Sequence, residues 1–96
     1  MTMERLNDEQ ISERLEKLEG WQRNGEAIER SLEFDSFLDA ISFINRISDP
    51  AEEADHHPEI FNVYNRVDLT LTTHDAGGLT EKDFSLAEQI NSEILG

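Results

Sequence analysis

The chain has 96 residues, no cysteine, and 22 acidic against 8 basic side chains, giving a formal charge of −14 at pH 7. This length predicts one domain over residues 1–96, because two cores would each approach the lower size limit for folding. The absence of cysteine excludes a disulfide framework, a thiolate metal site and a thiol nucleophile. The negative charge disfavours direct binding to nucleic acid or an anionic membrane. No apolar run approaches a membrane span of roughly 20 residues and no apolar signal core begins the chain, so we expect a soluble, cytoplasmic protein.

The first elements predicted along the chain are a helix and a hairpin. Asn7 is a candidate N-cap, and apolar residues at helical spacing continue until Gly20, which predicts a helix over about residues 8–18. Asn24-Gly25 is a strong hairpin-turn signal. Apolar and polar residues alternate after it up to Phe34, so one face of this hairpin is expected to meet water.

A second helix is predicted to begin at a cap formed by Asp35 or Ser36, because apolar residues then recur at helical spacing. Pro50 interrupts this pattern. Proline fits the first position of a helix, with Asp49 as cap and Glu52 three residues on. The helix is therefore expected either to kink or to restart at this point.

Two adjacent histidines follow at the end of this helical segment. His57 precedes Pro58, which biases its backbone away from the helical region. The helix should therefore end near Asp55 or His56. This places the histidine pair at a corner between a helix and a strand.

The second half of the chain predicts another hairpin. Residues 60–64 and 67–73 are β-rich runs around a turn at Asn65-Arg66. The apolar residues of the second run share one face, and the opposite face continues into His74. If the apolar face packs on the helices, His74 lies on or beside the open face.

A loop over residues 75–78 leads to the last predicted helix. Thr80 and Asp83 have the spacing of a capping box, and Leu79 and Phe84 that of a hydrophobic staple. The order of elements is then helix, hairpin, helix, hairpin, helix. This order predicts an α+β two-layer sandwich, in which three helices cover one face of a four-stranded antiparallel sheet.

All three histidines lie in one short, acid-rich segment of the chain. Histidine is the side chain that titrates near neutral pH. His56 and His57 can converge on one ligand only where the backbone turns, and His74 could return to the same cleft from the neighbouring strand. Three imidazoles around one pocket would suit stepwise proton donation and abstraction.

Several residues of this segment have a structural interpretation as well. A three-histidine metal site is disfavoured, because His-Glu-x-x-His spacing is absent and adjacent ligands are awkward. Asp83 is expected to cap a helix rather than act as a catalytic acid. Tyr64 is expected to be a sheet or core aromatic rather than a proton donor. Glu52 could cap a restarted helix or touch a ligand.

The segment resembles the pterin-4a-carbinolamine dehydratases. Their pattern of an acidic residue, His-His-Pro, an aromatic residue, a third histidine and an aspartate stands here as Glu52, His56-His57-Pro58, Tyr64, His74 and Asp83. The resemblance extends over nearly the whole chain, including Leu18-Glu19-Gly20-Trp21 and residues 61–65 and 72–80. It implies an α+β fold and subunits that join their sheets edge to edge in dimers, which can pair into tetramers.

The resemblance also implies a lyase, 4a-hydroxytetrahydrobiopterin dehydratase, that needs no metal or redox cofactor. Such an enzyme removes water from the 4a-hydroxytetrahydropterin left by an aromatic amino acid hydroxylase, and so returns quinonoid dihydropterin to tetrahydrobiopterin recycling. By this resemblance His56 and His74 form the acid–base pair that serves the hydroxyl, and His57 holds and polarises the pterin. The other pocket positions implied are Glu52, Asp55, Thr72, Thr73 and Asp75.

Two positions depart from the family pattern, and one alternative function stays open. Pro50 stands where an unbroken helix is expected, which bears on the placement of Glu52 and Asp55. Ile60 stands where tryptophan is frequent, which would weaken stacking near the ligand. The alternative is a non-catalytic dimerisation or regulatory binding module of the same fold, although the complete histidine trio favours retained chemistry.

Overall fold

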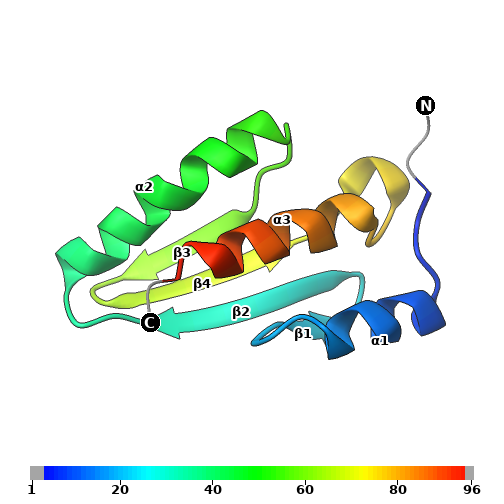
Figure 1. The fold of residues 1–96 in the computed structure, drawn as a ribbon, viewed down its shortest axis with the longest axis horizontal. Helices are drawn as coiled ribbons and strands as arrows, with labels where there is room; N and C mark the ends of the chain where they lie inside the picture. Colours follow the sequence, from blue (N-terminus) through cyan, green and yellow to red (C-terminus); the bar gives the residue numbers. More distant parts are fainter. Residues whose placement is uncertain (1–3, 95–96) are drawn as a thin grey trace.

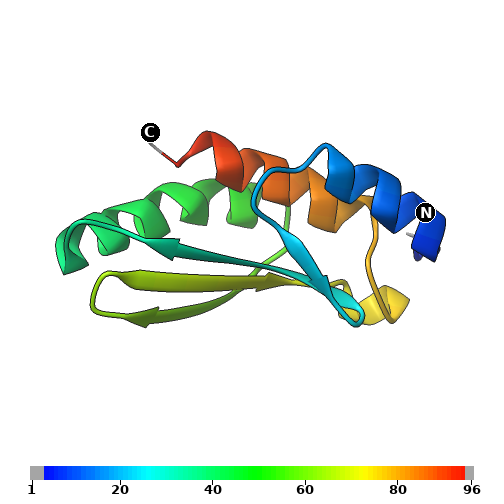
Figure 2. The ribbon, with the colours of Figure 1, turned by 90° about the horizontal axis from the view of Figure 1, so that it is seen from below.

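The computed structural model describes residues 4–94. The elements follow in the order α1 (Asp8–Glu16), β1 (Gln22–Asn24), β2 (Ala27–Glu33), α2 (Phe37–Glu53), β3 (Glu59–Val63), β4 (Arg66–Leu71), the short 3-10 helix η1 (His74–Ala76) and α3 (Glu81–Ser92). The strands form one antiparallel sheet in the order β1-β2-β4-β3. The three α-helices lie in one layer over one face of this sheet (Figure 1 and Figure 2). The predicted two-layer α+β sandwich is confirmed.

The helices begin at the predicted caps. Asn7 and Gln10 form a capping box at α1, and Thr80 and Asp83 form one at α3. The Ser36 side chain caps α2. No helix within residues 4–94 is both long and apolar enough to cross a bilayer.

α2 continues through Pro50 as one helix, so the predicted restart at this residue is wrong. The buried residues of α2 run along one face from Ala40 to Ala51, one position beyond the proline. This burial favours the helical path. Pro50 stands at the start of the last turn, and the one hydrogen bond lost is that from its own nitrogen to the carbonyl of Arg46. Glu52 therefore lies in that last turn and does not cap a new helix.

The sheet contributes its apolar face to the core. Val67, Leu69 and Leu71 of β4 are buried on the predicted helix side, and Ile28 of β2 lies opposite Leu71. The second hairpin turn is one residue earlier than predicted, since Val63 pairs with Arg66. β4 is also shorter than predicted, and its chain turns into η1 at the end of the sheet where the histidines lie.

An ion pair on the surface joins the first and last helices of the chain. Arg14 of α1 hydrogen-bonds to Glu81 in the first turn of α3. This hydrogen bond holds the pKa of the Glu81 carboxyl below its ordinary value. Because the Glu81 side chain is largely exposed, the pair contributes little to stability.

Candidate functional site

The predicted site residues gather where the C-terminal end of α2, η1 and the N-terminus of α3 meet (Figure 1). A cleft of about 280 Å³ at this end is lined by Asp55, His56, His57, Thr72, Thr73, His74, Asp75 and Lys82. The structure thus brings together all three histidines and all the other predicted site residues except Glu52. Lys82 is an addition that the sequence reasoning missed.

A turn at the end of α2 positions the first histidine. Asp55 adopts a positive φ of 50°, its N–H donates to the Glu52 carbonyl, and the N–H of His56 donates to the Ala51 carbonyl, both at 3.1 Å. These two bonds are those of a Schellman motif, in which glycine usually occupies the Asp55 position. The turn that orients the two neighbouring histidines is therefore at Asp55, ahead of Pro58.

Replacing Asp55 with glycine is expected to give a more stable protein than replacing it with alanine. A residue with a Cβ is strained at this positive φ, so the glycine variant should gain about 1 kcal/mol in free energy of unfolding over the alanine variant. Both variants lack the carboxylate, so the difference between their free energies of unfolding reports the backbone strain at this position. Urea denaturation measures it, and equal midpoints would show that Asp55 carries no strain.

His56 is the buried member of the trio. Its side chain is largely covered, and its Nε2 lies 2.5 Å from Oδ1 of Asp83, which is 0% exposed. Oδ2 of Asp83 accepts hydrogen bonds from the Thr80 N–H at 3.0 Å and from the Thr73 hydroxyl at 2.8 Å. The predicted capping role of Asp83 is confirmed. Its contact with His56 was not predicted, because the capping box alone accounts for an aspartate at this position.

His57 lies at the surface, paired with the acidic residue of the motif. Its Nε2 is 2.8 Å from Oε1 of Glu52, and both side chains are mostly exposed. His57 and Glu52 also line a second hollow of about 440 Å³ between α2 and β3, together with Ile47, Ser48, Asp49, Ala51, Pro58 and Ile60. Glu52 therefore contacts the ring of His57 from outside the histidine cleft.

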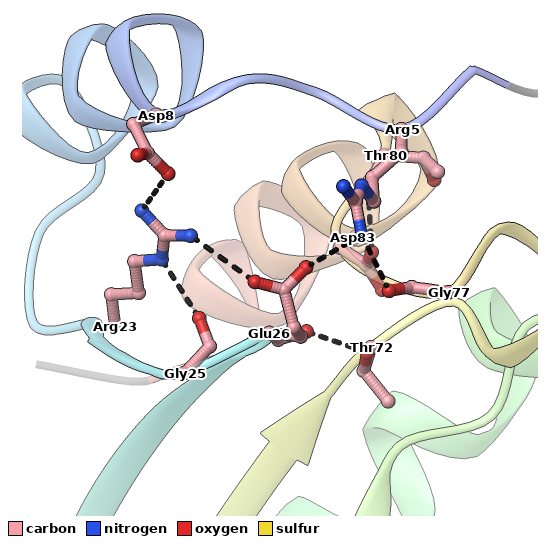
Figure 3. Close-up of polar contacts among 9 residues, drawn as sticks. All are labelled: Arg5, Asp8, Arg23, Gly25, Glu26, Thr72, Gly77, Thr80 and Asp83. Carbon is pink, nitrogen blue, oxygen red and sulfur yellow. Dashed lines mark hydrogen bonds and ion pairs between the residues drawn. The ribbon is translucent and has the colours of Figure 1, made fainter.

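His74 begins η1 and is exposed. The loop that carries His74 is anchored by hydrogen bonds to residues from the N-terminal part of the chain. Thr72 donates its hydroxyl hydrogen to the Glu26 carbonyl at 2.6 Å, and Arg5 donates to the Gly77 carbonyl at 3.3 Å (Figure 3). These contacts anchor the backbone around η1 while His74 itself lines the cleft.

The two threonines predicted to contact a ligand are already bonded within the protein. The Thr73 hydroxyl donates to Asp83, and the Thr73 N–H and carbonyl both pair with Gly78. The Thr72 hydroxyl has given its hydrogen to Glu26, so its oxygen can only accept from a ligand. Their role in ligand binding stays a prediction.

Tyr64 lies outside the candidate site. It occupies the β3–β4 turn with a φ of 49° and is 65% exposed, so the expectation of a sheet or core aromatic is wrong. The turn begins one residue before the predicted position, which moves this side chain out of the strand. Among residues 4–94, no group of three His, Cys, Asp or Glu side chains is placed to hold one metal ion.

The cleft combines groups that can exchange protons with groups that can hold a polar ligand. Three imidazoles, the carboxylates of Asp55 and Asp75, and the ammonium group of Lys82 line one small space. Imidazole donates and accepts protons near neutral pH, and carboxylates accept hydrogen bonds from amide-like N–H groups. This chemistry suits a reaction that adds one proton to a small polar molecule and removes another.

Comparisons with known proteins support the same interpretation. A protein of Thermomicrobium roseum, provisionally named a pterin-4-alpha-carbinolamine dehydratase, is 49% identical over 88 residues, which are 92% of this chain and 95% of that protein. A protein of Koribacter versatilis with the same provisional name is 49% identical over 86 residues, covering 90% of this chain and 92% of its own.

Two solved structures share the fold. A crystal structure described as a transcriptional coactivator/pterin dehydratase from Brucella melitensis has a TM-score of 0.89 at 45% identity, and the match covers 93% of this chain and 97% of that one. A pterin dehydratase-like protein identified as a RuBisCO assembly factor has a TM-score of 0.62 at 20% identity, covering 76% and 84%, and shows the fold alone. The family described as "Pterin 4 alpha carbinolamine dehydratase" matches residues 4–93. Since this match spans nearly the whole chain and includes every residue of the cleft, the chain belongs to the pterin-4-alpha-carbinolamine dehydratase family.

Proposed function

We propose that this protein is a hydro-lyase that dehydrates 4a-hydroxytetrahydropterin to quinonoid dihydropterin. The observation that carries the proposal is the convergence of His56, His57 and His74 on one cleft with two carboxylates. Membership of the family supports the same class of substrate. The proposal needs no metal or redox cofactor, because the reaction moves only protons and one water molecule.

The reaction breaks the C4a–O bond and removes the proton on N5 of the pterin. One protonated imidazole gives its proton to the leaving hydroxyl, which departs as water. A neutral imidazole takes the N5 proton as the C4a=N5 double bond forms. We assign these two roles to the pair His56 and His74, which restores the total number of protons on the enzyme after each turnover.

The remaining groups of the cleft are proposed to bind the pterin. His57, held by Glu52 at 2.8 Å, polarises the ring. The carboxylates of Asp55 and Asp75 accept hydrogen bonds from the amide-like edge of the pterin. Thr72 and Thr73 complete the wall of the cleft. The ligand then lies between the end of α2 and η1.

Replacing His74 with alanine is expected to lower the rate of dehydration by about 10²-fold, the lower end of the range for one acid–base group, because water can enter this exposed position. The unfolding midpoint should stay near that of the wild type, since the His74 side chain is exposed. Absorbance of chemically generated 4a-hydroxytetrahydropterin follows the reaction. A wild-type rate of dehydration no higher than that of this variant would contradict the proposed activity.

An aromatic amino acid hydroxylase that releases the 4a-carbinolamine is the proposed pathway partner, in cytoplasmic tetrahydrobiopterin recycling. Assembly of the chain into dimers or tetramers is also proposed. β3 is an edge strand, and Phe61 and Val63 on it are 56% and 53% exposed. Such an exposed apolar edge strand suits pairing with a second copy of the same strand.

A second candidate function is that of a non-catalytic dimerisation or regulatory module. Apolar residues are exposed on β3, and so are Phe37 and Leu38 at the start of α2. Exposed apolar patches of this kind are typical of surfaces that contact other proteins. The description of the Brucella structure names a coactivator as well as a dehydratase. A partner retained equally well by the wild type and by the His74→Ala protein, with no dehydration by either, would favour this function.

A further inference from the structure

We infer that Asp83 is a positioning residue that locks His56 in one tautomer, with the hydrogen on Nε2 and with Nδ1 presented to the cleft. The tautomer is a property of the folded protein. Only its catalytic consequence rests on the proposed function.

Hydrogen bonds at the start of α3 run in one direction towards Asp83. The Lys82 N–H donates to the Thr80 hydroxyl at 3.2 Å, and the Thr80 and Thr73 hydroxyls lie 2.9 Å apart. Because Thr73 donates its hydrogen to Oδ2 of Asp83, the hydroxyl of Thr80 must donate to that of Thr73. Oδ2 also accepts the Thr80 N–H at 3.0 Å (Figure 3). Oδ2 is therefore fixed as an acceptor of two hydrogen bonds.

These donors leave the other oxygen of the Asp83 carboxylate, Oδ1, for His56. Two hydrogen bonds end on Oδ2, and the N-terminal end of α3 also points its positive partial charge at this carboxylate. Within residues 4–94 the only basic side chain paired with Asp83 is that of His56. A fully buried carboxylate also requires a donor at its second oxygen, Oδ1. At 2.5 Å from Oδ1, Nε2 of His56 must supply that hydrogen.

The other ring nitrogen of His56 faces the cleft. Among residues 4–94, every buried side-chain nitrogen or oxygen has a hydrogen-bond partner. The described contacts of the His56 ring run through Nε2 alone. Nδ1 therefore reaches the surface of the cleft that His56 lines. In the neutral ring Nδ1 carries a lone pair for accepting a proton, and in the charged ring it carries the proton that can be given away.

This geometry makes Nδ1 the only nitrogen through which His56 can exchange a proton with the substrate. Nε2 keeps its hydrogen in both charge states, because the buried carboxylate of Asp83 holds it. Asp83 itself does not line the cleft. It acts through His56, by holding the ring in place and by selecting which nitrogen is free.

The substitution Asp83→Asn is expected to reverse the tautomer. The oxygen of the new amide must stay at the Oδ2 position, because the Thr80 N–H and the Thr73 hydroxyl both donate there. Its NH₂ group then faces Nε2 of His56, which can only accept that hydrogen bond as an unprotonated nitrogen. The remaining ring hydrogen moves to Nδ1, and the nitrogen that faces the cleft loses its ability to accept a proton.

Long-range ¹H–¹⁵N NMR of ¹⁵N-histidine-labelled protein distinguishes the two ring nitrogens at a pH where His56 is neutral. The wild type should show a protonated Nε2 and an unprotonated Nδ1, and Asp83→Asn should show the reverse. Glu52→Gln is the matched control, because it makes the same change beside His57 and should leave the His56 signals unaltered. A wild-type His56 protonated on Nδ1 would overturn the inference without any variant.

Kinetics provide the second readout. Asp83→Asn should lower kcat for dehydration by about 10²–10⁴-fold, the range for loss of one acid–base group, while KM changes little because Asp83 does not touch the ligand. An unchanged kcat in a protein with the reversed tautomer would refute the positioning role. If the wild type shows the expected tautomer but no dehydration, the proposed function fails while the assignment of the tautomer stands.

Discussion

Replacing His56 with alanine is expected to lower the rate constant for dehydration by about 10⁴-fold, the upper end of the range for one acid–base group. His56 is 9% exposed, so water is poorly placed to replace its ring. The change also removes the donor to the buried Oδ1 of Asp83. Both effects make this substitution more damaging than that of His74. Stopped-flow absorbance with chemically generated substrate measures the rate.

A His56→Gln variant separates chemistry from folding in the same position. The glutamine amide can donate a hydrogen bond to the Asp83 carboxylate, so this variant should recover much of the stability that alanine loses. It cannot exchange a proton and should remain as inactive as the alanine variant. A His56→Gln protein with wild-type turnover would contradict the role of His56 as a proton carrier.

Replacing Phe43 with alanine is expected to cost about 3–5 kcal/mol of unfolding free energy. Phe43 lies on α2, is 0% exposed and packs its ring 5.1 Å from that of Phe34. Domains of this kind have a total stability of about 5–15 kcal/mol, so the loss would be a large share. Because His56 follows directly on the C-terminal turn of α2, activity should fall as the folded fraction falls.

The matched control for this prediction is Phe37→Ala. Phe37 is the same residue type on the same helix, but it is 47% exposed. Its replacement should change stability by about 0.5 kcal/mol, as for most surface substitutions. Urea denaturation followed by circular dichroism compares the two variants. Equal losses of unfolding free energy at the two positions would show that Phe43 does not lie on the buried face of α2.

The fold could be predicted because its signals are local. The N-cap at Asn7, the capping box at Thr80, the Asn24-Gly25 turn and the alternation in β4 each depend on a few neighbouring residues. Of the two alternatives predicted at Pro50, a kink or a restart, the restart was wrong, because burial of the neighbouring Ala51 favours a continuous helical path. Tertiary packing decided that element, and packing cannot be read from local spacing.

The candidate site was predictable only in part. The grouping of the histidines followed from a turn after α2 and from the pairing of β3 with β4, both visible in the sequence. The contact between His56 and Asp83 joins residues 27 positions apart, and no local pattern connects them. The positive φ of Asp55 was also hidden, since glycine or asparagine is the usual residue at such a position.

The proposed function depends on whether the cleft accelerates loss of the 4a-hydroxyl. The most direct measurement is the rate at which purified full-length protein converts chemically generated 4a-hydroxytetrahydropterin to quinonoid dihydropterin, compared with the spontaneous reaction in the same buffer. Acceleration by the wild type that largely disappears in the His56→Gln protein is the predicted result. A wild-type rate equal to the spontaneous rate, in protein shown to be folded, would contradict it.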